Sequence, residues 1–164
     1  MTSPHALRLL VMGIGNPYRS DDAAGVIAAR RLKEAGLDPA IVMEHSGEGA
    51  SLMETWKGAD AVILIDAVSS GSPPGSIHRL EPITTPLPTH MFQSSSHAFS
   101  LPQAVEMARA LHELPMRLLI FGIEGSNFQA GTELTPAVSK ALPDLVKSVL
   151  EEVKRLQAAC TKGE

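Results

Sequence analysis

Short apolar runs alternate with stripes of apolar residues at helical spacing along this chain. Residues 7–12, 61–65 and 117–123 are almost continuously apolar, which is typical of strands buried on both faces of a sheet. Segments 40–44 and 76–80 are shorter predicted strands. Because the strands alternate with helices, the pattern predicts a three-layer α/β fold with a mainly parallel sheet between helical layers.

Four helices are predicted from the same pattern. The first follows a glycine turn and the pair Asp21-Asp22, and it ends at Gly36. A short second helix carries Leu52 and Trp56 on one face. Ser100 begins a capping box that starts the third helix, whose partner in the box is Gln103.

The last helix is predicted to start at Thr135-Pro136. Pro143 lies inside it and is expected to kink or restart it, and residues 157–164 are expected to fray. Residues 81–93 contain three prolines and are predicted to be a surface loop. Neither an internal repeat nor a linker divides the sequence, so residues 1–164 are predicted to be one domain.

Three side chains suited to metal binding are expected on one edge of this sheet. Ligands bind outside the carboxyl ends of parallel strands. Asp22 follows the first predicted strand, Asp66 directly follows the strand at 61–65, and His97 precedes the third helix. Two carboxylates and an imidazole suit a divalent ion such as zinc or nickel.

Each of these residues also has a purely structural interpretation. An Asp in the first turn of a helix is ordinarily a cap, and the partial positive charge there is expected to lower the pKa of both Asp21 and Asp22. Asp66 could accept backbone N–H groups at a strand end, and His97 could pack as a polar core residue. Only their convergence on one crevice favours a functional site.

Other polar residues are expected near the same edge. Glu44 and His45 begin a polar loop after the second predicted strand, and Asn16 lies in the turn after the first. We predict these three as substrate-binding residues. The loop that begins at Glu124 is expected at this edge as well.

Composition excludes several classes of function. The net charge is −4 and the basic residues are scattered, which disfavours a nucleic-acid partner. No apolar run approaches the roughly 20 residues of a membrane helix, so no membrane partner is expected. The single cysteine, Cys160, excludes an internal disulfide and fits a cytoplasmic protein.

Taken together in order and spacing, these motifs resemble the hydrogenase maturation proteases, which trim the C-terminal extension of nickel-containing hydrogenase large subunits. The resemblance covers almost the whole chain. It rests on the following segments: Gly13-Ile14-Gly15-Asn16-Pro17 with Asp21-Asp22; Ile65-Asp66-Ala67; Ser95-Ser96-His97 with Leu101; and Gly122-Ile123-Glu124 with Leu134-Thr135-Pro136.

The resemblance implies a twisted five-stranded sheet with helices on both faces. It also implies an endopeptidase in which Asp22, Asp66 and His97 are catalytic and contact a metal. That metal would be nickel already carried by the hydrogenase large-subunit precursor, so no tightly bound resident metal is expected. The three side chains would fix the scissile bond and help to position or activate a water.

The chain departs from the family pattern at two places. Ser20 and Ala23 flank the aspartate pair where the family often has glycine, and Glu44-His45-Ser46-Gly47 replaces an Asp-Gly-Gly-Thr-like loop. That loop is associated with substrate choice, so the hydrogenase served stays open.

Two alternatives are retained. Peptidyl-tRNA hydrolases share the Gly-x-Gly-Asn-Pro turn, but they expect an Arg-His-Asn segment and a basic surface. A non-catalytic module that senses metal loading would hold the metal without cleaving the precursor.

Overall fold

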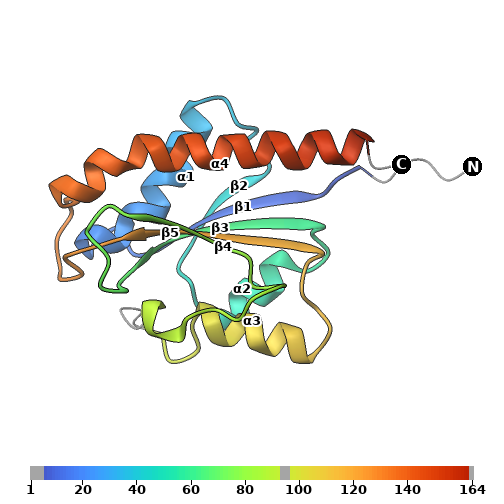
Figure 1. The fold of residues 1–164 in the computed structure, drawn as a ribbon, viewed down its shortest axis with the longest axis horizontal. Coiled ribbons are helices and arrows are strands. Elements are labelled where there is room, and N and C mark those ends of the chain that lie inside the picture. Colours follow the sequence, from blue (N-terminus) through green and yellow to red (C-terminus); the bar gives the residue numbers. More distant parts are fainter. Residues whose placement is uncertain (1–5, 93–96, 163–164) are drawn as a thin grey trace, which may run out of the picture.

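The computed structural model describes residues 6–92 and 97–162 and shows a sheet between two helical layers (Figure 1). Five strands form the sheet: β1 (Leu9–Ile14), β2 (Val42–His45), β3 (Ala61–Val68), β4 (Ile77–Leu80) and β5 (Arg117–Glu124). Their order is β2-β1-β3-β5-β4; the first four are parallel and β4 pairs antiparallel with β5. The predicted α/β, mainly parallel, five-stranded sheet is confirmed.

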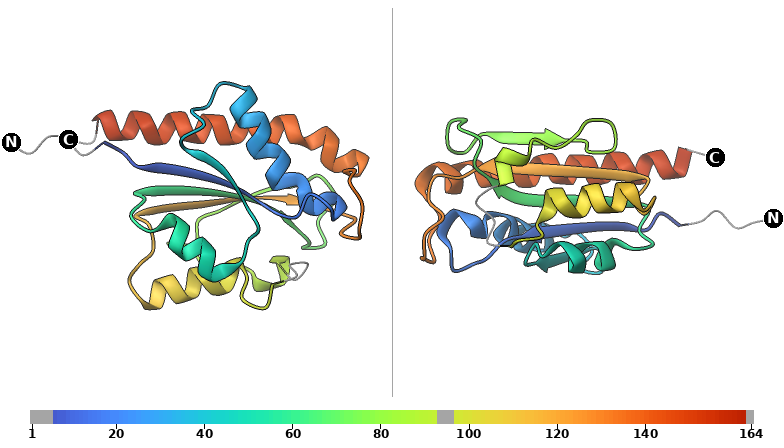
Figure 2. Two further views of the ribbon diagram at one scale, coloured as in Figure 1. Left: turned by 180° about the vertical axis from the view of Figure 1, so that it is seen from behind. Right: turned by 90° about the horizontal axis from the view of Figure 1, so that it is seen from below.

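Two layers of helices cover the faces of the sheet (Figures 1 and 2). Helices α1 (Ala24–Glu34) and α4 (Pro136–Lys162) lie on one face, and α2 (Gly49–Trp56) and α3 (Leu101–Ala110) lie on the other. Side chains alternate between the faces along each strand, so β3 supplies Ile63 and Ile65 to the first layer and Val62 and Leu64 to the second.

The connections make a switch point between β1 and β3. The chain leaves β1 through α1 to β2 on one side, and then returns through α2 to β3 on the other side of β1. At such a point the two connections diverge and leave a crevice at the carboxyl ends of the strands. Asp22 and Asp66 belong to the segments that bound this crevice.

Several predicted boundaries are wrong. The third strand continues past residue 65 to Val68, because β3 keeps pairing with β5 after β1 has ended at Ile14. Helix α4 runs through Pro143 without restarting and reaches Lys162, so residues 157–162 are helical rather than frayed. Residues 163–164 lie outside the described part.

The proline-rich segment 81–93 is not only a surface loop. It contains a short 3₁₀ helix, η2 (Thr89–Phe92), and its Leu87, Met91 and Phe92 are buried with the α2 and α3 layer. Apolar residues that are spaced irregularly between prolines give no periodic signal, which is why the pattern missed them.

Within the described residues, none of the helices is both long and apolar enough to cross a membrane.

Gly25 allows α1 to start directly above the ends of two strands. A Cβ atom at this position would lie 2.3 Å from the carbonyl oxygens of both Ile14 and Ile65. Only a residue without a side chain therefore permits this approach.

We expect Gly25→Ala to lower the free energy of unfolding by about 3 kcal/mol, because the clash is with backbone rather than with flexible side chains. Gly36→Ala is the control: nothing lies within 4 Å of its would-be Cβ, and its φ of +97°, which Gly25 does not share, accounts for an expected cost of about 1 kcal/mol. Urea unfolding measures both, and equal losses would contradict the close-approach argument.

Candidate active site

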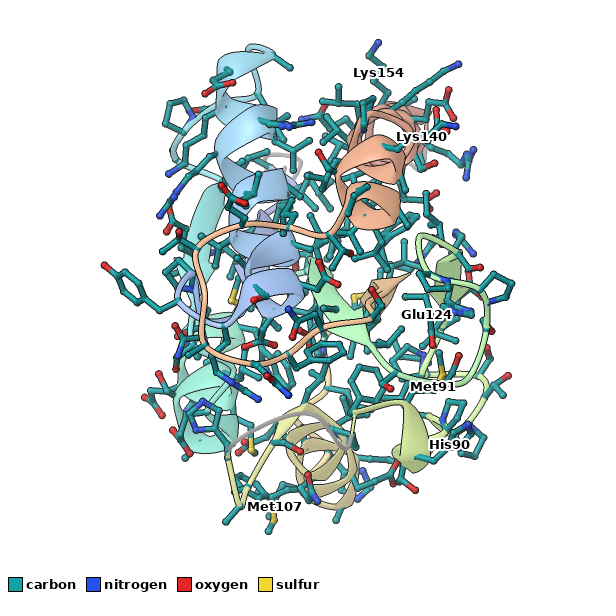
Figure 3. The ribbon with its side chains drawn as sticks, turned by 90° about the vertical axis from the view of Figure 1, so that its left-hand side faces the viewer. His90, Met91, Met107, Glu124, Lys140 and Lys154 are labelled. Atoms are coloured by element: carbon teal, nitrogen blue, oxygen red, sulfur yellow. The ribbon has the colours of Figure 1, made fainter. Side chains whose placement is uncertain are left out.

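A cleft of about 310 Å³ opens at the carboxyl ends of β1 and β3. Figure 3 looks onto this end of the sheet. All three predicted metal-binding side chains, Asp22, Asp66 and His97, line the cleft. Its other polar lining residues are Asn16, Ser46 and Ser100, and its apolar lining includes Ile14, Pro17, Tyr18, Ala67, Phe92 and Leu101.

Asp66 reaches the cleft because β1 stops before β3 does. Gly13 pairs with Ile65, and one residue further along β1 ends at Ile14, so the strand has no partner for Asp66 on this side. The alternation along β3 directs Asp66 to the same face as Leu64, which is the α2 and α3 layer. Because β3 runs to Val68, Asp66 lies inside this strand, and the prediction that it directly follows the strand is wrong.

Asp22 lies in a 3₁₀ turn, η1 (Ser20–Ala23), that leads into α1. Its Oδ2 accepts a hydrogen bond from the backbone N–H of Asn16 at 3.1 Å and lies 3.7 Å from Arg19 Nη1. These contacts hold its carboxylate against the turn after β1. No side-chain cap is formed at the start of η1 or α1, so the capping interpretation is wrong for both aspartates.

Burial raises the pKa of Asp22 above its ordinary value and outweighs the hydrogen bond from Asn16 and the charges of Arg19 and His97. The expected lowering by the helix start is therefore wrong for Asp22. Burial raises the pKa of Asp66 still further, and the negative charge of Asp22 adds to this effect. The negative charge of Asp22 thus opposes the ionisation of Asp66 within the cleft.

His97 is fixed from the opposite wall of the cleft. Its Nε2 lies 3.1 Å from the backbone oxygen of Ser46. Since a carbonyl oxygen only accepts, Nε2 carries a proton, and the neutral form of the ring with this hydrogen bond has its lone pair on Nδ1. Ser95 and Ser96, which belong to the same motif, lie outside the described residues.

Asp21 is buried and acts as a structural anchor. Its carboxylate accepts backbone N–H groups from Ser126 (2.8 Å), Asn127 (3.0 Å) and Thr135 (2.8 Å), and also the Thr135 hydroxyl. Burial raises the pKa of Asp21, but these hydrogen bonds outweigh it and leave the pKa below its ordinary value. The expected lowering is confirmed for Asp21, with a different cause.

Three other predicted residues are placed as follows. Asn16 lines the cleft. Glu44 makes two hydrogen bonds of 3.0 Å with the guanidinium of Arg30 in α1. His45, the last residue of β2, makes hydrogen bonds with Gly47 in the following loop and with Ser51 in α2. Neither Glu44 nor His45 is among the residues that line the cleft, and direct substrate contact by them stays a prediction.

Glu124 is buried beside the cleft rather than in it. Its carboxylate accepts the backbone N–H groups of Ser70 and Gly71 at 2.7 and 3.0 Å. In Figure 3 it lies above Met91, whose backbone oxygen accepts the N–H of Ser69. Glu124, the last residue of β5, therefore holds the turn after β3, while the bond between Ser69 and Met91 joins that turn to η2. Sequence spacing gave no indication of this role.

The described residues contain no group of three His, Cys, Asp or Glu side chains close enough to hold a metal ion by themselves. Asp22, Asp66 and His97 line one cleft and interact electrostatically, yet they surround it rather than close on one point.

Comparison with known proteins identifies relatives of the whole chain. A family model described as "Hydrogenase maturation protease" matches residues 26–152, a range that includes Asp66 and His97 and starts after Asp22. A hydrogenase expression/formation protein HupD from Bradyrhizobium diazoefficiens is 28% identical, covering 99% of this chain and 90% of the relative. The hydrogenase 2 maturation protease of Escherichia coli is 27% identical, with 90% and 92% covered.

Solved structures agree with these relatives. The hydrogenase maturating endopeptidase HybD from E. coli superposes with a TM-score of 0.75 at 27% identity, over 91% of this chain and 93% of that one. A [NiFe] hydrogenase maturation protease HycI from Thermococcus kodakarensis has a TM-score of 0.69 at 24% identity, with 90% and 92% covered, and supports the fold.

We expect Asp21→Asn to lower the free energy of unfolding by about 3 kcal/mol at neutral pH, because the amide nitrogen would face backbone donors. The lowered pKa means that Asp21 stabilises the wild type above the ordinary carboxyl value of 3.8 and loses this effect as the pH falls. The difference between variant and wild type in urea unfolding should therefore shrink in acid; a pH-independent difference would contradict the ionised anchor.

Asp66→Asn should have the opposite effect and stabilise the protein by about 0.5–2 kcal/mol at neutral pH. Because the pKa of Asp66 is raised, ionisation costs the wild type stability as the pH rises above 3.8, and asparagine avoids this cost. Asp144→Asn, on the exposed face of α4, is the control and should change little. A destabilised Asp66→Asn protein would show that the carboxylate is not strained in the free cleft.

Proposed function

The chain belongs to the hydrogenase maturation protease family, and we propose that it removes the C-terminal extension of a hydrogenase large-subunit precursor whose bound nickel it recognises. Membership makes the chain a peptidase, and it decides against the peptidyl-tRNA hydrolase and the non-catalytic module that the sequence left open. The specific role of nickel and of the individual residues is our proposal.

One observation carries the proposal: two carboxyls with raised pKa values share a cleft with an imidazole. A divalent ion adds positive charge to that of Arg19, which lies near Asp22 and still leaves the pKa of both cleft carboxyls raised. A precursor that carries nickel is therefore favoured over the same precursor without it, because only the loaded form compensates Asp22 and Asp66. The nitrogen and oxygen donors suit a borderline ion such as nickel.

In this proposal the nickel belongs to the substrate and anchors it. Asp22, Asp66 and the Nδ1 atom of His97 contact the ion, and the precursor's own ligands complete its coordination. Fixing the ion fixes the peptide bond beside it, which gives a hydrolysing water a defined direction of attack. The isolated protein should accordingly hold a divalent ion only loosely.

Asn16 is proposed to bind the peptide next to the ion. Its Oδ1 accepts the backbone N–H of Tyr18 at 2.9 Å, which directs the amide group within the cleft wall. The amide N–H groups can then donate to a peptide carbonyl of the precursor.

We also place the reaction in the cytoplasm, since the only cysteine is the exposed Cys160.

The test is incubation of the purified protein with nickel-loaded and nickel-free precursor, followed by mass measurement of the product. We expect a shortened product only from the loaded precursor. Asp22→Asn, Asp66→Asn and His97→Ala should each reduce processing by about 100-fold while unfolding stays cooperative. Cys160→Ser should process normally.

Three outcomes would contradict the proposal. Normal processing by any of the three variants would remove that residue from the site. Loss of processing in Cys160→Ser, together with inhibition by thiol reagents, would indicate a cysteine mechanism. Cleavage of nickel-free precursor by a protein that carries stoichiometric zinc would show a resident metal instead of a borrowed one.

A further inference from the structure

Residues 45–49 run from the last residue of β2 to the first residue of α2, and this 45–49 loop carries the part of the cleft wall that His97 contacts. Ser46 and Gly47 line the cleft, and the backbone oxygen of Ser46 accepts the Nε2–H of His97. A second contact joins the same segments, since Gly49 N–H donates to the backbone oxygen of Phe99 at 2.8 Å. The position of His97 thus depends on the shape of the 45–49 loop.

The side chain of His45 holds this loop from inside. The backbone N–H of Gly47 donates to Nδ1 of His45 at 2.9 Å. Because Nδ1 accepts, the proton of the neutral ring is on Nε2, and Nε2–H donates to Ser51 Oγ at 3.0 Å. One imidazole therefore closes the turn at Gly47 and ties it to the first turn of α2.

The turn that His45 closes leaves little room for other arrangements. Gly47 has a φ of +92°, and a Cβ on it would lie 2.8 Å from Ile14 Cγ2 at the floor of the cleft. The carboxylate of Glu48 caps α2 by accepting from the N–H groups of Ala50 and Ser51 at 3.0 and 2.8 Å. The Ser46 carbonyl lies between these fixed points and so has a defined direction.

We propose that His45 is a positioning residue: by accepting from Gly47 and donating to Ser51, it aims the Ser46 carbonyl at Nε2 of His97 and leaves Nδ1 as the nitrogen for the substrate's metal. This assignment rests on the proposed function of His97. It gives His45 a role through a neighbouring imidazole instead of through direct contact with substrate. In metal sites, hydrogen bonds to the second ring nitrogen of a histidine ligand fix its tautomer and the orientation of its ring.

The surroundings of His45 support a neutral ring. Burial lowers the pKa of His45, and this outweighs the opposing hydrogen bond with Ser51 and the charge of Glu48; the nearby ring of His97 lowers it further. A neutral imidazole is the form that can accept at one nitrogen and donate at the other.

The test compares His45→Ala, His45→Asn and Ser51→Ala on nickel-loaded precursor. His45→Ala should lower kcat/KM by about tenfold, because the Gly47 N–H loses its acceptor and the loop its tie to α2. His45→Asn should recover most of the activity, because an asparagine oxygen can accept the N–H two residues on. Ser51→Ala removes only the tie to α2 and should fall between them.

His112→Asn is the matched control. His112 is exposed, it lies at the far end of α3 from the cleft, and its φ of +56° suits asparagine, so activity should not change. The tautomer of His97 is read separately from long-range proton–nitrogen spectra of the imidazole rings in the free proteins. Wild type and His45→Asn should show the Nε2–H form, and His45→Ala should show a mixture.

The outcomes separate this inference from the proposed function. Wild-type activity in His45→Ala, or an unchanged His97 tautomer in that variant, would overturn the inference while the protease function stands. Equal losses in His45→Ala and His45→Asn would overturn the acceptor role of His45. If wild type processes no precursor at all, the proposed function fails, and the ring spectra still decide whether His45 orients His97. Should His45→Ala not fold, Ser51→Ala and His45→Asn give the same decision.

Discussion

The close approach of α1 to the sheet at Gly25 is the constraint on which the site depends. A side chain there would collide with the carbonyl oxygens of Ile14, the last residue of β1, and Ile65, the last residue of β3 that pairs with β1. The approach places the turn before α1 over the ends of both strands. Asp22 from that turn and Asp66 from the longer strand then face one cleft, although they are far apart in the sequence.

The two adjacent aspartates Asp21 and Asp22 differ in pKa because their surroundings differ. Asp21 is given backbone N–H donors from the loop before α4, so its pKa falls and its charge stabilises the fold. Asp22 is given fewer donors and shares the cleft with Asp66, so the pKa of both cleft carboxyls rises. The hydrogen bonds of the ionised Asp21 stabilise the fold, and this stabilisation offsets the cost of burying the carboxyls of Asp22 and Asp66 nearby.

The sequence was sufficient for the sheet, its helices and the side chains that gather at its edge, because buried parallel strands give continuous apolar runs and their ends converge. The sequence was insufficient wherever the hydrogen-bond or packing partner of a residue is far away along the chain. Asp21 bonds residues more than 100 positions away, and nothing in the local pattern distinguishes it from its neighbour Asp22. The engagement of Glu44 by Arg30 and the burial of Met91 likewise depend on packing that periodicity does not encode.

The selectivity that we propose for a loaded precursor rests on the charge and the donor atoms of the cleft. Its walls hold two carboxylates with raised pKa values and an imidazole whose Nε2 proton is committed to the Ser46 carbonyl. Such a cleft gains most from a ligand that brings positive charge and further donor atoms together, and least from a neutral peptide. In the proposed mechanism, most of the binding free energy comes from the ion together with the chain that carries it, so metal loading of the precursor and binding of its scissile segment are coupled.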